Sequence, residues 1–182
     1  MTRYSYFFSV AFVLLLMSQL FMAYRTARIE SPKYEIVKSF EKFEIRNYDA
    51  MVLAQTQMNS NVYEESSSMG FKTIANYIFG GNKNNQKIAM TSPVIMEMGE
   101  SSKMSFVMPK EHSFENLPEP NSERVELIQM QPKTYAVLEF TGFANDKKIQ
   151  KHSKRLLQFL KSEKLAPVGN MKYLGYNPPW QV

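Results

Sequence analysis

The sequence predicts an α+β fold in which a strand–strand–helix–strand unit occurs twice and forms a distorted antiparallel β-barrel with two helices, behind an N-terminal transmembrane helix. Three observations lead to this prediction. The 182-residue chain begins with a long apolar run, short later segments alternate apolar and polar residues, and one order of elements appears twice. We divide the chain into residues 1–33, a membrane anchor or signal segment with its linker, and a domain over residues 34–182.

The N-terminal run from Tyr6 to Tyr24 holds 19 residues without a charge. As a helix it would span roughly 28 Å, close to the thickness of the hydrocarbon core of a bilayer. We therefore expect a single-pass membrane anchor at residues 6–24. The alternative is a cleaved signal peptide and an exported protein, since Arg3 would supply the charged start and Ala23 and Ala27 offer weak cleavage sites. The flanking charges leave open which side of the membrane the domain faces.

The first unit begins with two predicted strands. Residues 43–46 (FEIR) alternate apolar and polar side chains, and residues 51–58 (MVLAQTQM) are rich in strand-forming residues. A helix is predicted over residues 61–79 and ends at Gly80-Gly81. Its apolar residues fall near one stripe: Val62, Met69, Ile74, Tyr77 and Ile78. Residues 87–98 are extended and are interrupted at Ser92-Pro93, because proline cannot donate a ladder hydrogen bond.

The second unit follows the same order. A short alternating strand at residues 104–108 precedes a proline-containing loop over residues 109–121. Strands are predicted at residues 125–130 and 134–141, then a helix capped by Asp146 that runs to about Lys164, then a strand at residues 171–176.

Two pairs of segments can be laid over each other. Residues 50–56 match residues 135–141, and Phe43-Glu44-Ile45 matches Val125-Glu126-Leu127. Two copies of one unit would pair their strands into one curved antiparallel sheet or a distorted barrel, with both helices packed on it.

The residue content argues against catalysis and against a metal site. The chain has no Cys, which excludes disulfides, Cys-ligated metals and a Cys nucleophile, and no phosphate-binding or zinc-protease motif occurs. His112 lies in a polar, proline-rich loop and is predicted to be solvated. His152 lies on the second helix next to its inward stripe and is predicted to be a surface residue rather than a ligand. A net charge of +5 spread along the chain is not typical of a nucleic-acid binder. We therefore expect a binding protein and not an enzyme.

Ten of the 13 methionines lie beyond residue 33. The flexible, polarisable thioether fills ordinary cores and also lines adaptable apolar sites. The pattern favours core positions and leaves open an apolar groove for a flat ligand.

Several segments over about residues 34–180 carry a family resemblance. They are Tyr34-Glu35-Ile36, residues 43–48 (FEIRNY), 70–80 (GFKTIANYIFG), 88–94 (IAMTSPV), 104–109 (MSFVMP), 117–121 (LPEPN) and 175–180 (GYNPPW). In order and spacing they resemble the SOUL haem-binding protein family, and they are most similar to its bacterial and plant type. The IAMTSPV and GYNPPW segments are the most specific.

The resemblance implies a distorted β-barrel of duplicated halves that binds haem or a related tetrapyrrole non-covalently, mostly by apolar contact. It implicates these haem-binding residues: Asn47, Met69, Lys72, Thr73, Asn76, Tyr176, Pro178, Pro179 and Trp180. Asn47 stands where the family's proposed axial histidine follows E-I-R, and asparagine is a poor iron ligand. Asn76 stands where some members have a basic residue suited to a propionate, and Lys72 is the nearby cation.

The resulting hypothesis is a membrane-tethered carrier or buffer of tetrapyrroles. Its partners would be a hydrophobic small molecule and, through residues 6–24, the membrane. The alternatives are a binding module for other hydrophobic small molecules and a protein-interaction module that uses an exposed sheet edge.

Overall fold

The computed structural model describes residues 8, 10, 12–19, 29–60, 62–99 and 101–176. The chain divides into two compact units, Met1–Glu30 and Ser31–Val182. Within Met1–Glu30, residues 12–19 are helical. Within the described stretches, no helix combines the length and the apolar character needed to cross a membrane. The anchor predicted at residues 6–24 lies partly outside those stretches and stays a prediction.

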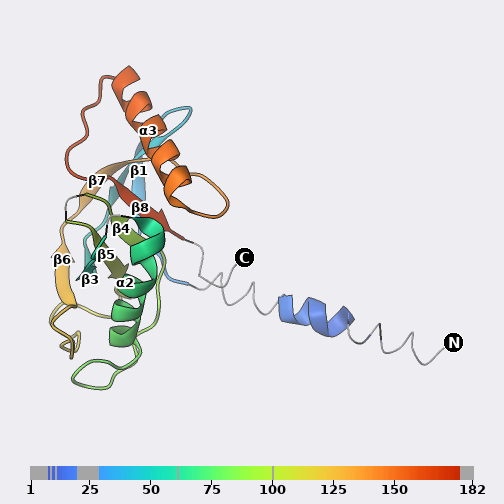
Figure 1. The fold of residues 1–182 in the computed structure, drawn as a ribbon, viewed down its shortest axis with the longest axis vertical. Helices are drawn as coiled ribbons and strands as arrows, with labels where there is room; N and C mark the ends of the chain where they lie inside the picture. The colour runs from blue at the N-terminus through green and yellow to red at the C-terminus, as the bar shows by residue number, and fades with distance from the viewer. Residues whose placement is uncertain are drawn as a thin grey trace. The chain divides into compact units, whose positions relative to one another are not determined.

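The domain Ser31–Val182 is built from short strands and two helices (Figure 1). In chain order its described elements are β1 (Tyr34–Ser39), β2 (Glu44–Tyr48), β3 (Met51–Gln57), α2 (Tyr63–Ile78), β4 (Val94–Glu97), β5 (Lys103–Val107), β6 (Glu126–Met130), β7 (Lys133–Val137), α3 (Asp146–Ser162) and β8 (Lys172–Gly175). The predicted order strand–strand–helix–strand therefore occurs as β2-β3-α2-β4 and again as β6-β7-α3-β8.

The described strands form two antiparallel sheets, and this corrects the predicted barrel. One sheet has the order β1-β2-β7 and the other the order β6-β3-β5-β4-β8. A barrel closes only when every strand has two neighbours. Here β7 and β8 each have one neighbour among the described strands, so the ladders do not close.

The strand pairing reflects the duplication, because three of the ladders join a strand of one unit to a strand of the other. β2 pairs with β7, β3 pairs with β6, and β4 pairs with β8. The two hairpins correspond when residue i is matched to residue i + 82, which takes Glu44 to Glu126 and Met51 to Lys133. The predicted overlay of residues 50–56 on 135–141 is wrong, because it shifts β3 by three residues and an odd shift exchanges the two faces of a strand.

The faces of the strands support this correction. The offset of 82 matches Ala54 with Ala136. Ala54 belongs to the core under α2, and Ala136 packs against the cluster that contains Leu156 and Leu160 of α3. Both alanines therefore lie on the face covered by the helix of their own unit.

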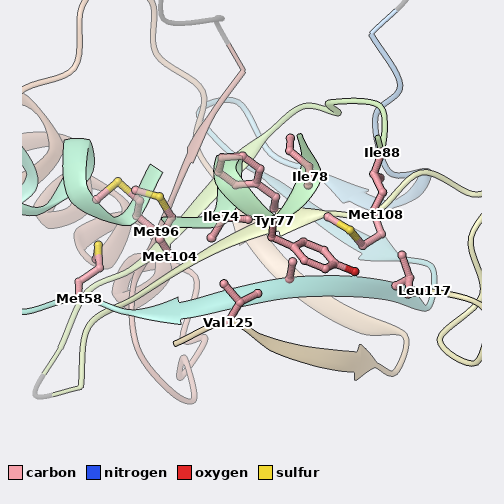
Figure 2. Packing of buried hydrophobic residues seen from close by; sticks show 12 residues of the cluster. Met58, Ile74, Tyr77, Ile78, Ile88, Met96, Met104, Met108, Leu117 and Val125 are labelled. Carbon is pink, nitrogen blue, oxygen red and sulfur yellow. The ribbon is translucent and has the colours of Figure 1, made fainter. Parts of the chain in front are cut away.

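The larger core lies between α2 and the five-stranded sheet (Figure 2). Its buried residues are Ala54, Met58, Ile74, Tyr77, Ile78, Ile88, Met96, Met104, Phe106, Met108, Leu117 and Val125. Four of them are methionines, so the core role predicted for methionine holds at these positions. The helix approaches β5 closely because residue 70 is glycine: a Cβ at Gly70 would lie 3.2 Å from the Met104 sulfur.

The smaller core lies between α3 and the three-stranded sheet. It contains Phe43, Leu156 and Leu160, with the Phe40 and Phe43 rings stacked at 4.3 Å between centroids. The side chain of Asn145 caps α3 by accepting a hydrogen bond from the Lys148 backbone N–H at 2.8 Å. Asp146, at the start of α3, accepts a hydrogen bond from the backbone N–H of Tyr63, the first residue of α2, at 2.7 Å. The two helix N-termini therefore meet.

Candidate functional site

The outer face of α2 gathers four of the predicted site residues. Met69, Lys72, Thr73 and Asn76 recur at intervals of three and four residues, so they share one side of the helix. The opposite side carries Ile74, Tyr77 and Ile78 into the core. Lys72 and Asn76 are exposed, Thr73 is half-buried, and 56% of Met69 is exposed. The sequence spacing therefore places these four residues on a common solvent-facing surface.

Apolar and polar groups are mixed on this outer face. The Asn59 amide donates to the Met69 sulfur at 3.7 Å, and the Thr73 hydroxyl donates to the Met69 carbonyl at 3.0 Å. Phe79 caps the C-terminal end of α2 and is 61% exposed. Large apolar side chains that stay exposed on one helix, with a cation one turn away, are typical of a contact surface.

Asn47 lies elsewhere. It is half-buried on β2, and its side-chain oxygen accepts a hydrogen bond from the Thr134 hydroxyl of β7 at 3.2 Å. It shares a face of β2 with Ile45, which packs in the core under α3. Since α2 packs on β3 and β5 of the other sheet, the structure does not bring Asn47 to the α2 face.

A cavity of about 1370 Å³ lies between the two sheets and α3. It exceeds the roughly 300–1,000 Å³ of common small-molecule sites. Alternate residues of β3, Leu53 and Gln55, face it, as do Ile95 and Glu97 of β4. Of the predicted site residues in the described part, only Tyr176 lines this cavity.

Aromatic rings and a buried cation form one wall of the cavity. Tyr48 packs against Tyr34 and Tyr135, at 5.2 and 5.8 Å between ring centroids. Arg46 lies over the Tyr34 ring at 4.5 Å and donates to Glu44 at 2.7 Å and to Glu139 at 2.6 Å. Burial opposes the charge of Arg46, but the hydrogen bonds to Glu139 and Glu44 raise its pKa above its ordinary value, so it stays a cation.

Tyr176 joins the same wall just beyond β8. Its backbone carbonyl accepts a hydrogen bond from the Ser92 hydroxyl at 3.0 Å. Although 44% of the residue is exposed, burial of the phenol and the neighbouring Tyr48 hydroxyl raise the pKa of Tyr176 well above its ordinary value. Tyr176 is therefore a neutral phenol at physiological pH.

An ion pair crosses from β4 to β8 where the two units meet. Lys172 and Glu97 are opposite each other in the ladder, with Nζ and Oε2 2.5 Å apart. Burial would raise the pKa of Glu97, but the Lys172 ammonium and the Asn170 amide together lower it below its ordinary value. The carboxylate stays ionised at neutral pH.

Comparison with known proteins gives the family. The model of the SOUL heme-binding protein family matches residues 29–182. The chain belongs to the SOUL family. It is 27% identical over 169 residues to Heme-binding protein 2 of Mus musculus, covering 85% of this chain and 81% of that protein. It is 23% identical over 163 residues to Heme-binding protein 1 of Xenopus laevis, covering 83% and 85%. Heme-binding protein 2 of Homo sapiens is 27% identical over 146 residues, covering 75% and 71%.

The site residues that the SOUL resemblance implies thus lie in separate parts of the fold. Met69, Lys72, Thr73 and Asn76 share the outer face of α2, whereas Asn47 and Tyr176 belong to other surfaces. The remaining predicted residues, Pro178, Pro179 and Trp180, lie outside the described residues.

The prediction that His112 is solvated is wrong, because its side chain is only 11% exposed, with Nε2 3.6 Å from Glu111 Oε1. His152 is half-buried on α3, and it stacks on Phe140 with 4.3 Å between ring centroids. Burial first, then the charges of Arg155, Lys151 and Lys148, lower its pKa, so the imidazole is neutral at pH 7. Its spacing from Ile149 and Leu156, at three and four residues, was the signal that it lies beside the inward stripe of α3.

The described residues hold no cluster of three or more His, Asp or Glu side chains that could bind a metal ion.

Proposed function

We propose that this chain binds haem or a related tetrapyrrole without catalysis, on the outer face of α2. The observation that carries the proposal is the exposure of Met69 and Phe79 beside Lys72 on one helix of a SOUL-family domain. The names of the relatives, Heme-binding proteins 1 and 2, support the choice of ligand.

The residues of this face fit the chemistry of the ligand. A tetrapyrrole offers a flat apolar ring, two carboxylates at one edge and, in haem, an iron that accepts a soft or nitrogenous ligand. Met69 and Phe79 would contact the ring, and Lys72 would pair with a propionate. The thioether of Met69 is an accessible soft donor on the face, and among the described residues it accepts a weak hydrogen bond from the Asn59 amide at 3.7 Å.

Thr73 and Asn76 complete the face with polar side chains of a different role. The Thr73 hydroxyl is committed to the Met69 carbonyl, which orients it along the helix. Asn76 is exposed one turn beyond Lys72 and can donate an amide hydrogen bond to a carboxylate. Such a face would bind its ligand through apolar contact with the ring and charge pairing with a propionate.

The proposal includes a membrane-tethered carrier or buffer role. The uncharged run at residues 6–24 supports the tether, with export after cleavage of that run as the alternative. Fractionation of cells that express the full chain, with and without residues 1–30, tests the tether. Equal recovery of both forms in the soluble fraction would contradict it.

Titration of the full chain with hemin, followed by the Soret band, tests the ligand. We expect a saturable shift of the band, and Met69→Ala should weaken binding by several-fold while leaving the far-UV spectrum unchanged, because Met69 is exposed. Asn47→His is the control and should leave the band unchanged, since Asn47 lies on the other sheet. A spectrum identical to that of hemin in buffer would contradict haem binding. A band sharpened by Asn47→His would move the site to β2.

A further inference from the structure

The charge of the domain is divided unevenly along the chain. Residues 34–182 carry 18 basic and 16 acidic side chains, which gives a net charge of only +2. The helix α3 alone holds six Lys or Arg side chains and one Asp, a net charge of +5. The other residues of the domain therefore carry 12 basic and 15 acidic side chains, a net charge of −3. The helix α3 is thus the basic part of a domain that is otherwise slightly acidic.

Four of these cations lie together on the outer face of α3. Leu156 and Leu160 belong to the core beneath the helix, so residues about half a turn away from them point outward. The exposed lysines on this outward side recur at intervals of three, four and seven residues, which keeps them on one face. We call this group the α3 lysine face, and its members are Lys147, Lys151, Lys154 and Lys161.

The domain does not neutralise the α3 lysine face. The salt bridges in the described part of the chain involve other cations, and none includes one of these four lysines. Lys147 lies in the first turn of α3, where a positive charge opposes the helix dipole. Lys151 lies one turn from both Lys147 and Lys154, and like charges at this spacing destabilise a helix slightly. Pairing among the described residues therefore does not explain why four cations gather here.

We propose that the α3 lysine face docks on the anionic headgroups of a lipid bilayer, the membrane that residues 6–24 would enter. Negatively charged lipid attracts polybasic segments close to a membrane, and each Lys near the surface strengthens the attraction by roughly fivefold. This inference rests on the membrane part of the proposed function. It is independent of haem binding, which is assigned to the outer face of α2.

The linker to the uncharged run favours a bilayer over an acidic protein or a nucleic acid as the partner. Residues 25–33 can span at most about 30 Å even when fully extended. They contain Arg25, Arg28 and Lys33 against the single acid Glu30, so the linker is itself basic. A domain on so short a linker would stay near the bilayer, which raises the effective concentration of headgroups around it.

The linker also leads into the part of the domain that carries α3. It continues into β1, which belongs to the sheet β1-β2-β7. The helix α3 packs on this sheet, because Ile45 of β2 and Ala136 of β7 contact the core that contains Leu156 and Leu160. The α3 lysine face is therefore on the same layer of the domain as the strand that follows the linker.

A dye on the outer face of α3 tests the docking in the full chain. The chain has no Cys, so an environment-sensitive thiol dye attached to Gln158→Cys labels one position. Gln158 is exposed and lies one turn from both Lys154 and Lys161. The labelled chain is reconstituted into phosphatidylcholine vesicles with and without about 30% phosphatidylglycerol. We expect a blue shift of the emission in the anionic vesicles only, and its loss as salt is added.

A second label and two charge variants are the controls. The dye on Gln129→Cys, an exposed position of β6 in the other sheet, should not distinguish the two kinds of vesicle. Lys151→Gln with Lys154→Gln should lower the ratio of docked to undocked domain by about thirtyfold, as expected when two cations leave an anionic lipid surface. Lys83→Gln with Lys87→Gln removes the same charge from exposed positions after α2 and should lower the ratio by less than about twofold.

Flotation with vesicles of phosphatidylcholine alone separates this inference from the tether, because an apolar run enters a bilayer whatever the charge of its lipids. A chain that floats, but whose label at Gln158→Cys responds equally in both kinds of vesicle, would contradict docking and leave the tether in place. A chain that does not float, but whose label responds to anionic vesicles alone, would support docking and contradict the tether.

Three further results would overturn the proposal. The first is an equal loss of docking in the two double variants, and the second is an equal response of the labels at Gln158→Cys and Gln129→Cys. The third is displacement of the α3 lysine face from anionic vesicles by duplex DNA or polyglutamate at about 0.15 M salt, which would assign the face to a nucleic acid or to an acidic protein.

Discussion

The two units of this domain have the same order of elements and equivalent ladders, yet the buried core under α2 is larger than the core under α3, which borders an open cleft. Under α2, twelve buried residues form one core (Figure 2) against a sheet whose middle strand is β5. Under α3, three buried residues form the core, and the helix borders a cavity of about 1370 Å³. The strand order differs in the same way: among the described strands, β5 lies between β3 and β4, and none lies between β7 and β8.

Polar groups show the same contrast. In the first unit the Tyr77 hydroxyl donates to the Pro118 carbonyl at 2.9 Å, and the buried Asn82 amide donates to the Tyr77 and Gln86 carbonyls. Around the cavity, Gln55 Oε1 and His152 Nδ1 have no hydrogen-bond partner in the described part of the chain, and the Tyr48 hydroxyl has the Tyr176 phenol as its neighbour. The two units of a duplicated fold can thus differ in how completely they pack.

The units should differ most in the stability that is lost when a core side chain is truncated to alanine. Ile74→Ala should lower the free energy of unfolding by about 3–4 kcal/mol, because Ile74 is fully buried among close-packed side chains. Leu156→Ala should cost only about 1–2 kcal/mol, since its surroundings already include empty space. Urea unfolding of both variants measures the difference. Equal losses would show that the α3 core is as well packed as the α2 core.

Removing one tyrosine hydroxyl from each unit, in two separate variants, should give a smaller difference in stability. Tyr77→Phe leaves the buried Pro118 carbonyl unpaired and should cost about 1–2 kcal/mol. Tyr48→Phe removes a buried hydroxyl that lies beside the Tyr176 phenol but makes no well-aligned hydrogen bond among the described residues, and it should change stability by less than about 1 kcal/mol. The midpoint of thermal unfolding reports both. A large loss in Tyr48→Phe would reveal a partner for this hydroxyl in solution.

The smallest effect concerns the ion pair at the junction of the units. The folded-state pKa of Glu97 lies below its ordinary value, so the stability it contributes is present at neutral pH and is lost as the pH falls through that lowered pKa. Lys172→Met should therefore flatten the loss of stability below about pH 4.3, by no more than about 1 kcal/mol. Unfolding measured from pH 7 to pH 3 tests this, with the exposed Lys154→Met as control. Parallel pH curves for wild type and Lys172→Met would exclude a role for the pair.

Local periodicity predicted the helices well and the strand pairing poorly. The helices expected at residues 61–79 and 146–164 are Tyr63–Ile78 and Asp146–Ser162, because long apolar stripes define helices locally. β1 was missed, since all six of its residues are exposed and give no alternation to detect. The described strands do not form the expected barrel, and closure depends on pairs distant in sequence that no local pattern records.

The same limit applies to the site. Helical spacing was sufficient to place Met69, Lys72, Thr73 and Asn76 on one face, whereas it could not show that Asn47 belongs to a different sheet. His112 was expected to be solvated because its loop is polar, although its side chain is largely buried. Helical spacing also could not predict that His152 stacks on Phe140, a residue 12 positions away in sequence. The cavity could not be predicted from the sequence, because it arises from the arrangement of β7, β8 and α3 rather than from any one segment.

A matched pair of charge reversals, one on each helix, tests the placement of haem most directly. Lys72→Glu on α2 and Lys154→Glu on α3 change the same charge at exposed positions of the two units. In hemin titrations of the full chain, we predict that Lys72→Glu weakens binding by about tenfold, as expected for loss of a charge-assisted contact to a propionate, while Lys154→Glu leaves the affinity unchanged. Equal affinities for both variants and wild type, or a loss confined to Lys154→Glu, would contradict haem binding on the outer face of α2.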